Sequence, residues 1–173
     1  LGYQPDSDEW KVMALSAVDS DAEELTADLS RTVRLNDDGS FELDQGFYTA
    51  ALYDQPNLYS AKLVEMVGGR VGHPGETAGE WHCRVAKAMQ AVAEEIAFHQ
   101  LNALHQRSGL EKVVLGGGFF MNSVLNGKIL DNTGFRDAYI SYAPADVGNS
   151  MGSALYVAHQ ILGQPRDFTH NSS

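Results

Sequence analysis

Helix and strand patterns alternate through the second half of the chain, and this alternation constrains the fold more than any other feature. Residues 78–107 repeat apolar side chains near the helical period, and residues 113–115 are a short apolar run that ends at glycine. After a further helix come a second strand, residues 138–142, and a last helix, residues 149–162. Because such strands are joined by helical crossovers, residues 78–163 predict an α/β fold whose ligands bind at the carboxyl ends of the strands.

Three consecutive glycines, Gly116, Gly117 and Gly118, follow the first of these strands. Glycine lets the backbone take a positive φ or lets another molecule come close to it. A strand, a glycine turn and a helix over residues 123–132 would offer backbone N–H groups and a helix N-terminus to a nucleotide or an anion. The spacing matches neither the dinucleotide fingerprint nor the phosphate loop, so a tight turn without a ligand remains an alternative.

The second strand leads into a segment that contains Asp146 and Gly148. If the two strands are neighbours, Asp146 and the glycine turn line one crevice. A carboxylate there can bind a divalent cation or cap the following helix, and spacing alone favours the cap. Gly148 and Gly152 are expected at positions of close packing, and Gly148 also where phosphate enters. Asn122 has two possible roles that are equally supported: it donates or accepts a hydrogen bond with a ligand, or it caps the helix over residues 123–132.

The first half of the chain predicts shorter elements. The expected elements are a helix over residues 9–15, an acidic amphipathic helix within residues 19–31, a hairpin of residues 33–35 and 41–43, and a helix near residues 58–67. The loop over residues 68–75 follows them.

The long helix over residues 78–107 is expected to begin with a capping box and to end at glycine. Thr77 and Glu80 have the spacing of such a box, and Gly109 supplies the C-terminal stop. None of the histidines on this helix is four residues from another, so we expect ordinary helix residues and no local metal pair.

The composition limits the classes of partner. The 173 residues are 43% hydrophobic and 20% charged, as in a soluble globular domain, and the net charge of −11 disfavours a nucleic-acid partner. No apolar run reaches the length of a membrane span. A single cysteine, Cys83, excludes an internal disulfide and suits a reducing compartment, so we expect a cytoplasmic protein without a membrane partner.

Three ordered segments carry a resemblance to a known family. They are residues 11–15, residues 116–122 with residues 126–129, and residues 144–155. These segments resemble the carbamoyltransferase family of the nodulation protein NodU and the antibiotic-tailoring O-carbamoyltransferases. That family shows Lys-Val-Met-Gly-Leu-Ala, Gly-Gly-Val-Ala-Leu-Asn followed by Asn-Gly, and an Asp-x-Gly segment with a later Gly-Ala. The resemblance covers residues 1–164, and residues 119–121 are bulkier here than in the family.

The resemblance implies an actin-like ATPase fold of the ribonuclease H-like type, with a mixed sheet flanked by helices, in a fragment of a larger protein. These enzymes share that fold with the universal tRNA threonylcarbamoyl-transfer protein. Residues 1–165 would form the second lobe of the larger domain, and residues 166–173 a tail. The first lobe, with a pair of metal-binding histidines, is expected upstream of Leu1. A YrdC-like domain is expected downstream of Ser173.

The resemblance also implies an O-carbamoyltransferase. Carbamoyl phosphate and ATP would give carbamoyl-adenylate, and the carbamoyl group would pass to a hydroxyl of a small-molecule acceptor. The residues that would contact ATP or carbamoyl-adenylate are Gly116, Gly117, Gly118, Asn122 and Gly148. Asp146 would be a ligand of a divalent metal, with Fe²⁺ the expected ion, and this reverses the preference for a helix cap.

Other readings of the same segments remain. A different actin-like ATP enzyme, such as the tRNA-modifying relative or a sugar kinase, would share the nucleotide site. A nucleotide-binding or dimerising module without catalysis would share it too. Taken alone, residues 1–173 are expected to be inactive, and an uncovered apolar surface would allow a homodimer. Lys11 has two possible roles, and a structural or surface lysine is at least as well supported as a lysine that contacts a ligand.

Overall fold

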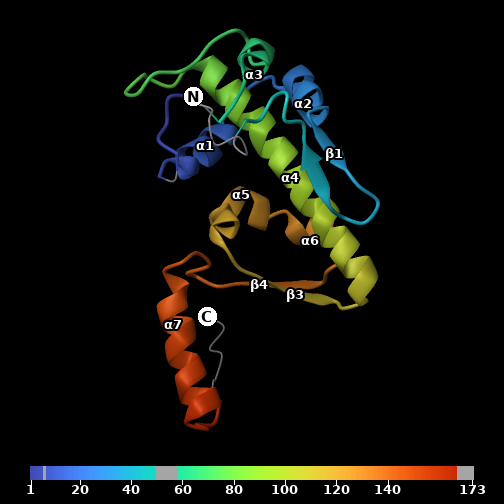
Figure 1. Cartoon of the computed structure of the whole chain (residues 1–173), viewed down its shortest axis with the longest axis vertical. Helices are drawn as coiled ribbons and strands as arrows, with labels where there is room; N and C mark the ends of the chain where they lie inside the picture. The colour runs from blue at the N-terminus through green and yellow to red at the C-terminus, as the bar shows by residue number, and fades with distance from the viewer. Residues whose placement is uncertain (6, 50–57, 167–173) are drawn as a thin grey trace.

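The computed structural model describes residues 1–5, 7–49 and 58–166 of a mixed α/β chain. Helix α4 (Glu80–Ser108) is its longest element and runs through its middle (Figure 1). Around the first half of α4 lie α1 (Glu9–Ser16), α2 (Glu23–Ser30) and α3 (Ala61–Met66). These three helices agree with the predicted ones to within a few residues. A small parallel sheet follows the C-terminal end of α4 (Figure 1).

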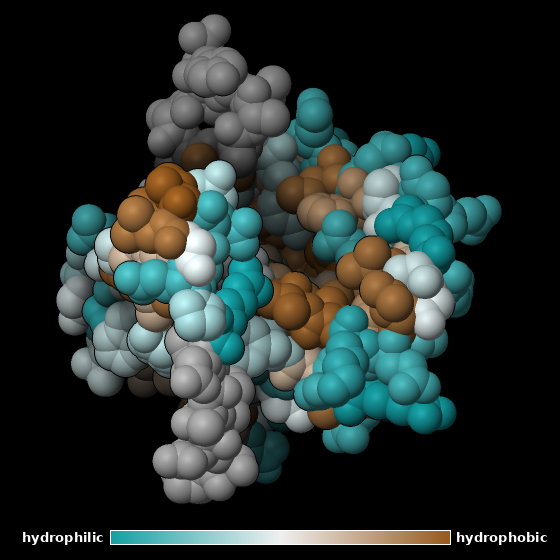
Figure 2. Space-filling view, turned by 90° about the horizontal axis from the view of Figure 1, so that it is seen from below, coloured by the Kyte–Doolittle hydropathy of each residue, from teal (hydrophilic) through white to brown (hydrophobic). Residues whose placement is uncertain are grey.

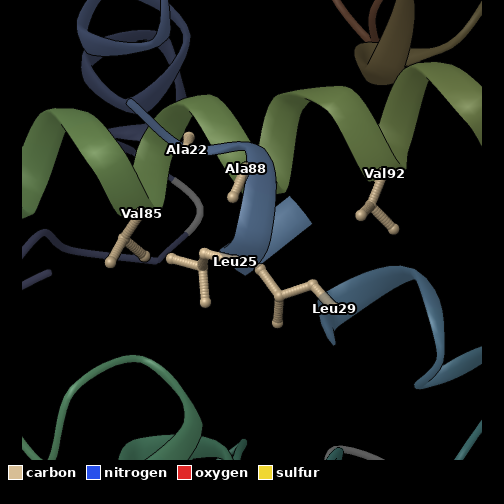
Figure 3. Close-up of a cluster of buried hydrophobic side chains, with 6 residues drawn as sticks. All are labelled: Ala22, Leu25, Leu29, Val85, Ala88 and Val92. Carbon is tan, nitrogen blue, oxygen red and sulfur yellow. The ribbon is translucent and has the colours of Figure 1, made fainter. Parts of the chain in front are cut away.

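The larger of two apolar clusters lies between α2 and α4. Leu25 and Leu29 of α2 are buried against Val85, Ala88 and Val92 of α4, whose side chains point toward them in Figure 3. The spacing of these residues along both helices is helical, which is why the sequence shows the pattern. Burial of one such leucine side chain stabilises the fold by about 1.5–3 kcal/mol.

The start of α4 differs from the prediction, whereas its end agrees. The helix ends at Gly109, whose φ of +65° is the left-handed conformation of a C-terminal glycine. The predicted capping box of Thr77 and Glu80 is wrong, because Gly79 is the cap, Glu80 is the first helical residue and His82 is the third. The ring Nδ1 of His82 accepts a hydrogen bond from the Gly79 N–H at 3.1 Å. A histidine in the first turn therefore does what the glutamate was expected to do.

Strands β1 (Val33–Leu35) and β2 (Phe41–Leu43) form the predicted antiparallel hairpin. Its turn is held against α4 by two contacts. His99 Nε2 lies 2.9 Å from the carbonyl oxygen of Asn36, and Arg107 donates to the carbonyl oxygen of Asp38 at 2.7 Å. The hairpin is thus part of the same packed unit as α4.

Strands β3 (Lys112–Leu115) and β4 (Asp137–Ile140) pair in parallel, as the alternation predicts. The described strands form two separate two-stranded sheets, one antiparallel and one parallel, and not the single mixed sheet that was expected. One face of this sheet is packed and the other is bare. The packed face forms the second apolar cluster, with Leu101, Val113, Leu115, Ile129 and Phe135 buried.

The connection from β3 to β4 is more broken than predicted. It consists of η1 (Gly118–Met121), α5 (Ser123–Asn126) and α6 (Ile129–Asn132). The single helix predicted over residues 123–132 is therefore wrong. Gly127 separates two one-turn helices, which fits the low helix propensity of glycine.

Helix α7 (Gly148–Tyr156) continues as a π-helical segment, η2 (Val157–Ile161), and together they match the predicted last helix. This pair projects away from the other elements (Figure 1). Gly163 follows with a φ of +63°. Apart from Arg166, the predicted tail lies outside the described residues. In the parts of the chain that are described, no helix joins the length and the apolar character needed to cross a bilayer.

Candidate functional site

The glycine turn lies against the segment that carries Asp146. The backbone N–H of Gly117 donates a hydrogen bond to the carbonyl oxygen of Pro144 at 2.7 Å. Because β3 and β4 are parallel neighbours, their carboxyl ends lie at the same edge of the sheet. The structure therefore brings the glycine turn and the segment that leads to Asp146 together at the edge where the sequence predicts a crevice, and the crevice itself stays a prediction.

The three glycines of the turn differ in what the fold demands of them. Gly117 has φ of +108° and ψ of 156°, a conformation that is essentially restricted to glycine. Gly116 and Gly118 do not have a positive φ. A Cβ built on any of the three would meet no described atom within 4 Å. Neither strain nor crowding by described atoms explains Gly116 and Gly118, whereas a close approach by another molecule would.

The apolar residues beside the turn are divided between the core and the surface. Phe120 packs on the second apolar cluster, whereas Phe119 and Met121 are 51% and 63% exposed. Val114 and Tyr139, partners in the sheet, are exposed on its bare face. In the view from below, hydrophobic residues lie at the surface among polar ones (Figure 2). This uncovered apolar surface adjoins the candidate site.

Asp146 does not cap α7. The cap residue of α7 is Val147, and no side chain makes a cap hydrogen bond there. The cap favoured by spacing alone is therefore wrong, and the Asp146 side chain is exposed at the edge of the site. Among residues 1–5, 7–49 and 58–166, no three His, Cys, Asp or Glu side chains gather where they could hold a metal. A metal at Asp146 would need ligands beyond these residues.

The two glycines at the start of α7 have different surroundings. A Cβ on Gly148 would collide with the carbonyl oxygen of Ala143, so close packing is confirmed there. A Cβ on Gly152 would meet no described atom within 4 Å, so the same expectation is wrong for Gly152. Beside Asp146, a shallow open depression runs along this helix and is lined by Gly148, Asn149, Gly152, Ser153, Tyr156 and Val157.

Asn122 caps α5, which is one of its two predicted roles. Its Oδ1 accepts a hydrogen bond from the Leu125 N–H at 3.0 Å. The same amide exchanges hydrogen bonds with the Gln90 side chain, at 2.8 and 3.1 Å. Contact between Asn122 and a ligand stays a prediction.

Sequence reasoning missed Gln90 and Glu94 on α4 and Lys128 before α6. Gln90 Nε2 donates to Glu94 Oε1 at 2.9 Å, and Lys128 Nζ lies 2.8 and 2.7 Å from the two Glu94 oxygens. Gln90 and Glu94 are polar residues four apart on the buried face of a long helix. That signal is present in the sequence, because buried polar residues need partners.

Lys11 is an ion-paired surface residue. Its Nζ lies 2.9 Å from Asp8 Oδ1 and 5.6 Å from the centre of the Trp10 ring. This environment accords with the structural role that the sequence allows.

His82 is the buried histidine of α4, with 1% of its surface exposed. Since Nδ1 accepts from Gly79, the neutral ring carries its proton on Nε2, which has no hydrogen-bond partner among the described residues. Burial, with a smaller effect of the Arg70 charge, lowers the pKa of His82 below its ordinary value. The carboxylate oxygen Oε2 of Glu76 lies 3.9 Å from Nε2. The lowered pKa favours the neutral ring, and the contact with Gly79 makes His82 a structural residue of the first turn of α4.

The chain belongs to the carbamoyltransferase family. Residues 1–155 match the family described as carbamoyltransferase N-terminus. That match includes the glycine turn, Asp146 and all of α4.

Curated proteins from several organisms are similar to the chain. Nodulation protein NolO of Bradyrhizobium diazoefficiens is 33% identical over 96 residues, which are 56% of this chain and 17% of that protein. Nodulation protein NolNO of Sinorhizobium fredii is 34% identical over 88 residues, 50% of this chain and 13% of that protein. Protein sll1178 of Synechocystis sp. is 27% identical over 165 residues, 95% of this chain and 26% of that protein. The chain thus spans about a quarter or less of these relatives.

Proposed function

We propose that this chain is part of an O-carbamoyltransferase. The enzyme moves a carbamoyl group from carbamoyl-adenylate, made from carbamoyl phosphate and ATP, to a hydroxyl of a small-molecule acceptor. Membership of the carbamoyltransferase family supports the class of reaction. The carbamoyl-adenylate route and the acceptor class come from the resemblance of the glycine and aspartate segments to the same family.

One observation carries the proposal to this site. The hydrogen bond from Gly117 to Pro144 joins a glycine turn to a carboxylate-bearing segment at the carboxyl edge of two parallel strands. This is the edge at which α/β folds bind nucleotides. In our proposal the turn lies against the adenylate, and Gly148 keeps the following helix close enough to line the same site.

The reaction has a simple balance of bonds. The acceptor hydroxyl oxygen forms a bond to the carbamoyl carbon, and the bond from that carbon to the adenylate phosphate oxygen breaks. AMP departs and the hydroxyl proton is released. The contribution of this chain is to bind and orient the adenylate, because a fixed geometry replaces the entropy cost of a chance encounter.

We propose Asp146 as one ligand of a divalent metal, with iron the expected ion. Its exposed carboxylate at the strand edge suits a hard or borderline cation. The remaining ligands would come from the paired histidines of a first lobe. The metal, when bound, would polarise oxygens of the mixed anhydride.

We also propose that the chain is the second lobe of an actin-like domain. Parallel strands joined by a helical crossover support this assignment. The bare face of the sheet supports it as well, because parallel sheets are normally covered on both faces.

The test is carbamoyl transfer by the intact protein. Carbamoyl phosphate, ATP and a panel of hydroxylated acceptors are supplied, and products are identified by mass spectrometry. Asp146→Asn should abolish transfer. Asp131 is an exposed carboxylate on α6, so the control substitution Asp131→Asn should leave transfer unchanged. A phosphorylated acceptor would instead indicate a kinase, and nucleotide binding without turnover would indicate a module that is not an enzyme.

A further inference from the structure

A buried polar network connects α4 to the end of the glycine turn. It consists of Gln90, Glu94, Asn122 and Lys128, and we call it the α4 tether. Gln90 and Glu94, one helical turn apart on α4, are 9% and 8% exposed. Buried polar side chains are retained at low cost only where their hydrogen bonds are made.

The two amides of the tether can adopt only one orientation. Gln90 Nε2 donates to the Glu94 carboxylate, which cannot donate, so this end of the Gln90 amide must be nitrogen. Asn122 Oδ1 accepts from the Leu125 N–H, so this end of the Asn122 amide must be oxygen. With both orientations fixed, each amide donates to the other and accepts from it. The pair is specific, because a flip of either amide would break three hydrogen bonds.

Lys128 neutralises the carboxylate at the base of the tether. Its Nζ lies within 2.8 Å of both Glu94 oxygens, and Glu94 is otherwise shielded from water. The backbone carbonyl of Phe120 accepts from Asn126 Nδ2 at 2.8 Å, which ties η1 to α5. The segment that leaves the glycine turn is therefore anchored through side chains to α4.

The turn itself lacks such anchors. Gly116, Gly117 and Gly118 have no side chains, and the described hydrogen bonds of the turn are made by the Gly117 backbone. Its N–H donates to the Pro144 carbonyl oxygen at 2.7 Å, and its carbonyl oxygen accepts from the Phe120 N–H at 3.0 Å. The position of the turn thus depends on these bonds and on the segments that flank it. Strand β3 precedes the turn, and η1 follows it, with Phe120 packed on the second apolar cluster and Asn122 held by Gln90.

We propose that Gln90 and Asn122 are positioning residues that together set the place of the glycine turn, and that Asn122 acts through Gln90 without touching the nucleotide. This inference rests on the proposed nucleotide site at the turn. It replaces a ligand contact at Asn122 by a contact with α4, and it adds Gln90, on another element, to the residues that nucleotide binding requires.

The experiment is a double-mutant cycle on the intact protein, with azido-ATP as the probe. Labelling is read on the tryptic peptide of residues 137–166, which none of the variants alters. Asn122→Ser keeps a good helix cap but cannot reach Gln90. Gln90→Leu keeps the bulk but removes the two hydrogen bonds with Asn122 and the one donated to Glu94. The third variant carries both changes. The concentration of azido-ATP that gives half of the maximal labelling is compared among the four proteins.

The inference predicts that each single change raises the half-saturating concentration about 5- to 10-fold, the worth of one or two buried hydrogen bonds. The double change should raise it no further than the larger single effect, because both remove the same tether. Asn102→Ala is the matched control, since Asn102 is also an α4 amide that holds a loop, at Asn132 and Gly134. It should leave the labelling unchanged, although it also removes two hydrogen bonds between α4 and a loop.

Four results would contradict the proposals, three of them the inference alone and one the proposed nucleotide site as well. If Asn122→Ser weakens labelling and Gln90→Leu does not, Asn122 contacts the nucleotide directly and the inference is overturned. The same holds if Asn102→Ala weakens labelling as much as Gln90→Leu, because the effect is then general destabilisation. If the unaltered protein transfers carbamoyl groups but Gln90→Leu leaves labelling unchanged, the inference alone fails. If the unaltered protein is not labelled on this peptide, the proposed nucleotide site fails, and the inference with it.

Discussion

Alanine substitutions in the glycine turn should separate the demands of the fold from those of a ligand. Gly117→Ala places a side chain at a φ of +108°, which should destabilise the surrounding structure by about 1–3 kcal/mol. No clash adds to this cost, because the new Cβ meets no described atom within 4 Å. Gly116→Ala and Gly118→Ala carry neither cost, so their effect on stability should stay within about 0.5 kcal/mol.

Nucleotide binding should be sensitive to the two substitutions that leave stability unchanged. A methyl group on Gly116 or Gly118 projects into the open space from which a nucleotide would approach, so both variants should lose azido-ATP labelling while they stay folded. Local stability is measured by hydrogen exchange of the β3 amides, which reports opening of this region in an intact protein. Equal destabilisation by Gly116→Ala and Gly117→Ala would refute the conformational argument. Unchanged labelling of Gly116→Ala would refute a close approach of the nucleotide to the turn.

Three other perturbations follow from the described contacts. Leu29→Ala, at a fully buried position, should lower the free energy of unfolding by about 2–5 kcal/mol in urea titrations, and a loss comparable to that of a surface change would contradict the packing in Figure 3. Lys128→Met should lower the free energy of unfolding by about 1–2 kcal/mol, a modest loss because Lys128 is half-exposed. Adding Glu94→Gln, which removes the unpaired charge, should restore most of that free energy. Because burial lowers the pKa of His82, the unfolded state binds the proton more readily, so stability should fall as pH drops below about 6.5, and His82→Gln should flatten that dependence. An unaltered slope in His82→Gln would place the pH dependence elsewhere.

Elements defined by local pattern were predictable from the sequence. The parallel pair of β3 and β4, the hairpin and the end of α4 at Gly109 each follow from periodicity or from turn residues close together in the chain. The contact between the glycine turn and the segment that leads to Asp146 followed in turn, since parallel neighbours bring their carboxyl ends to one edge. Such inferences need no knowledge of contacts between distant residues.

What the sequence did not reveal depends on contacts across the chain. Asn122 and Gln90 are 32 positions apart, and no local pattern pairs them. The helix predicted over residues 123–132 is interrupted at Gly127, next to Lys128. The Lys128 side chain contacts Glu94, which is 34 positions away in the chain. The start of α4 was misplaced because a histidine ring can accept the hydrogen bond that was assigned to a glutamate.

The central claim is that the carboxyl ends of β3 and β4 form one nucleotide site, and photolabelling of the intact protein tests it most directly. After irradiation with azido-ATP and digestion with trypsin, the account predicts label on the peptides of residues 113–128 and 137–166, suppressed by excess ATP. Competed label confined to other peptides, with these two unmodified, would contradict it.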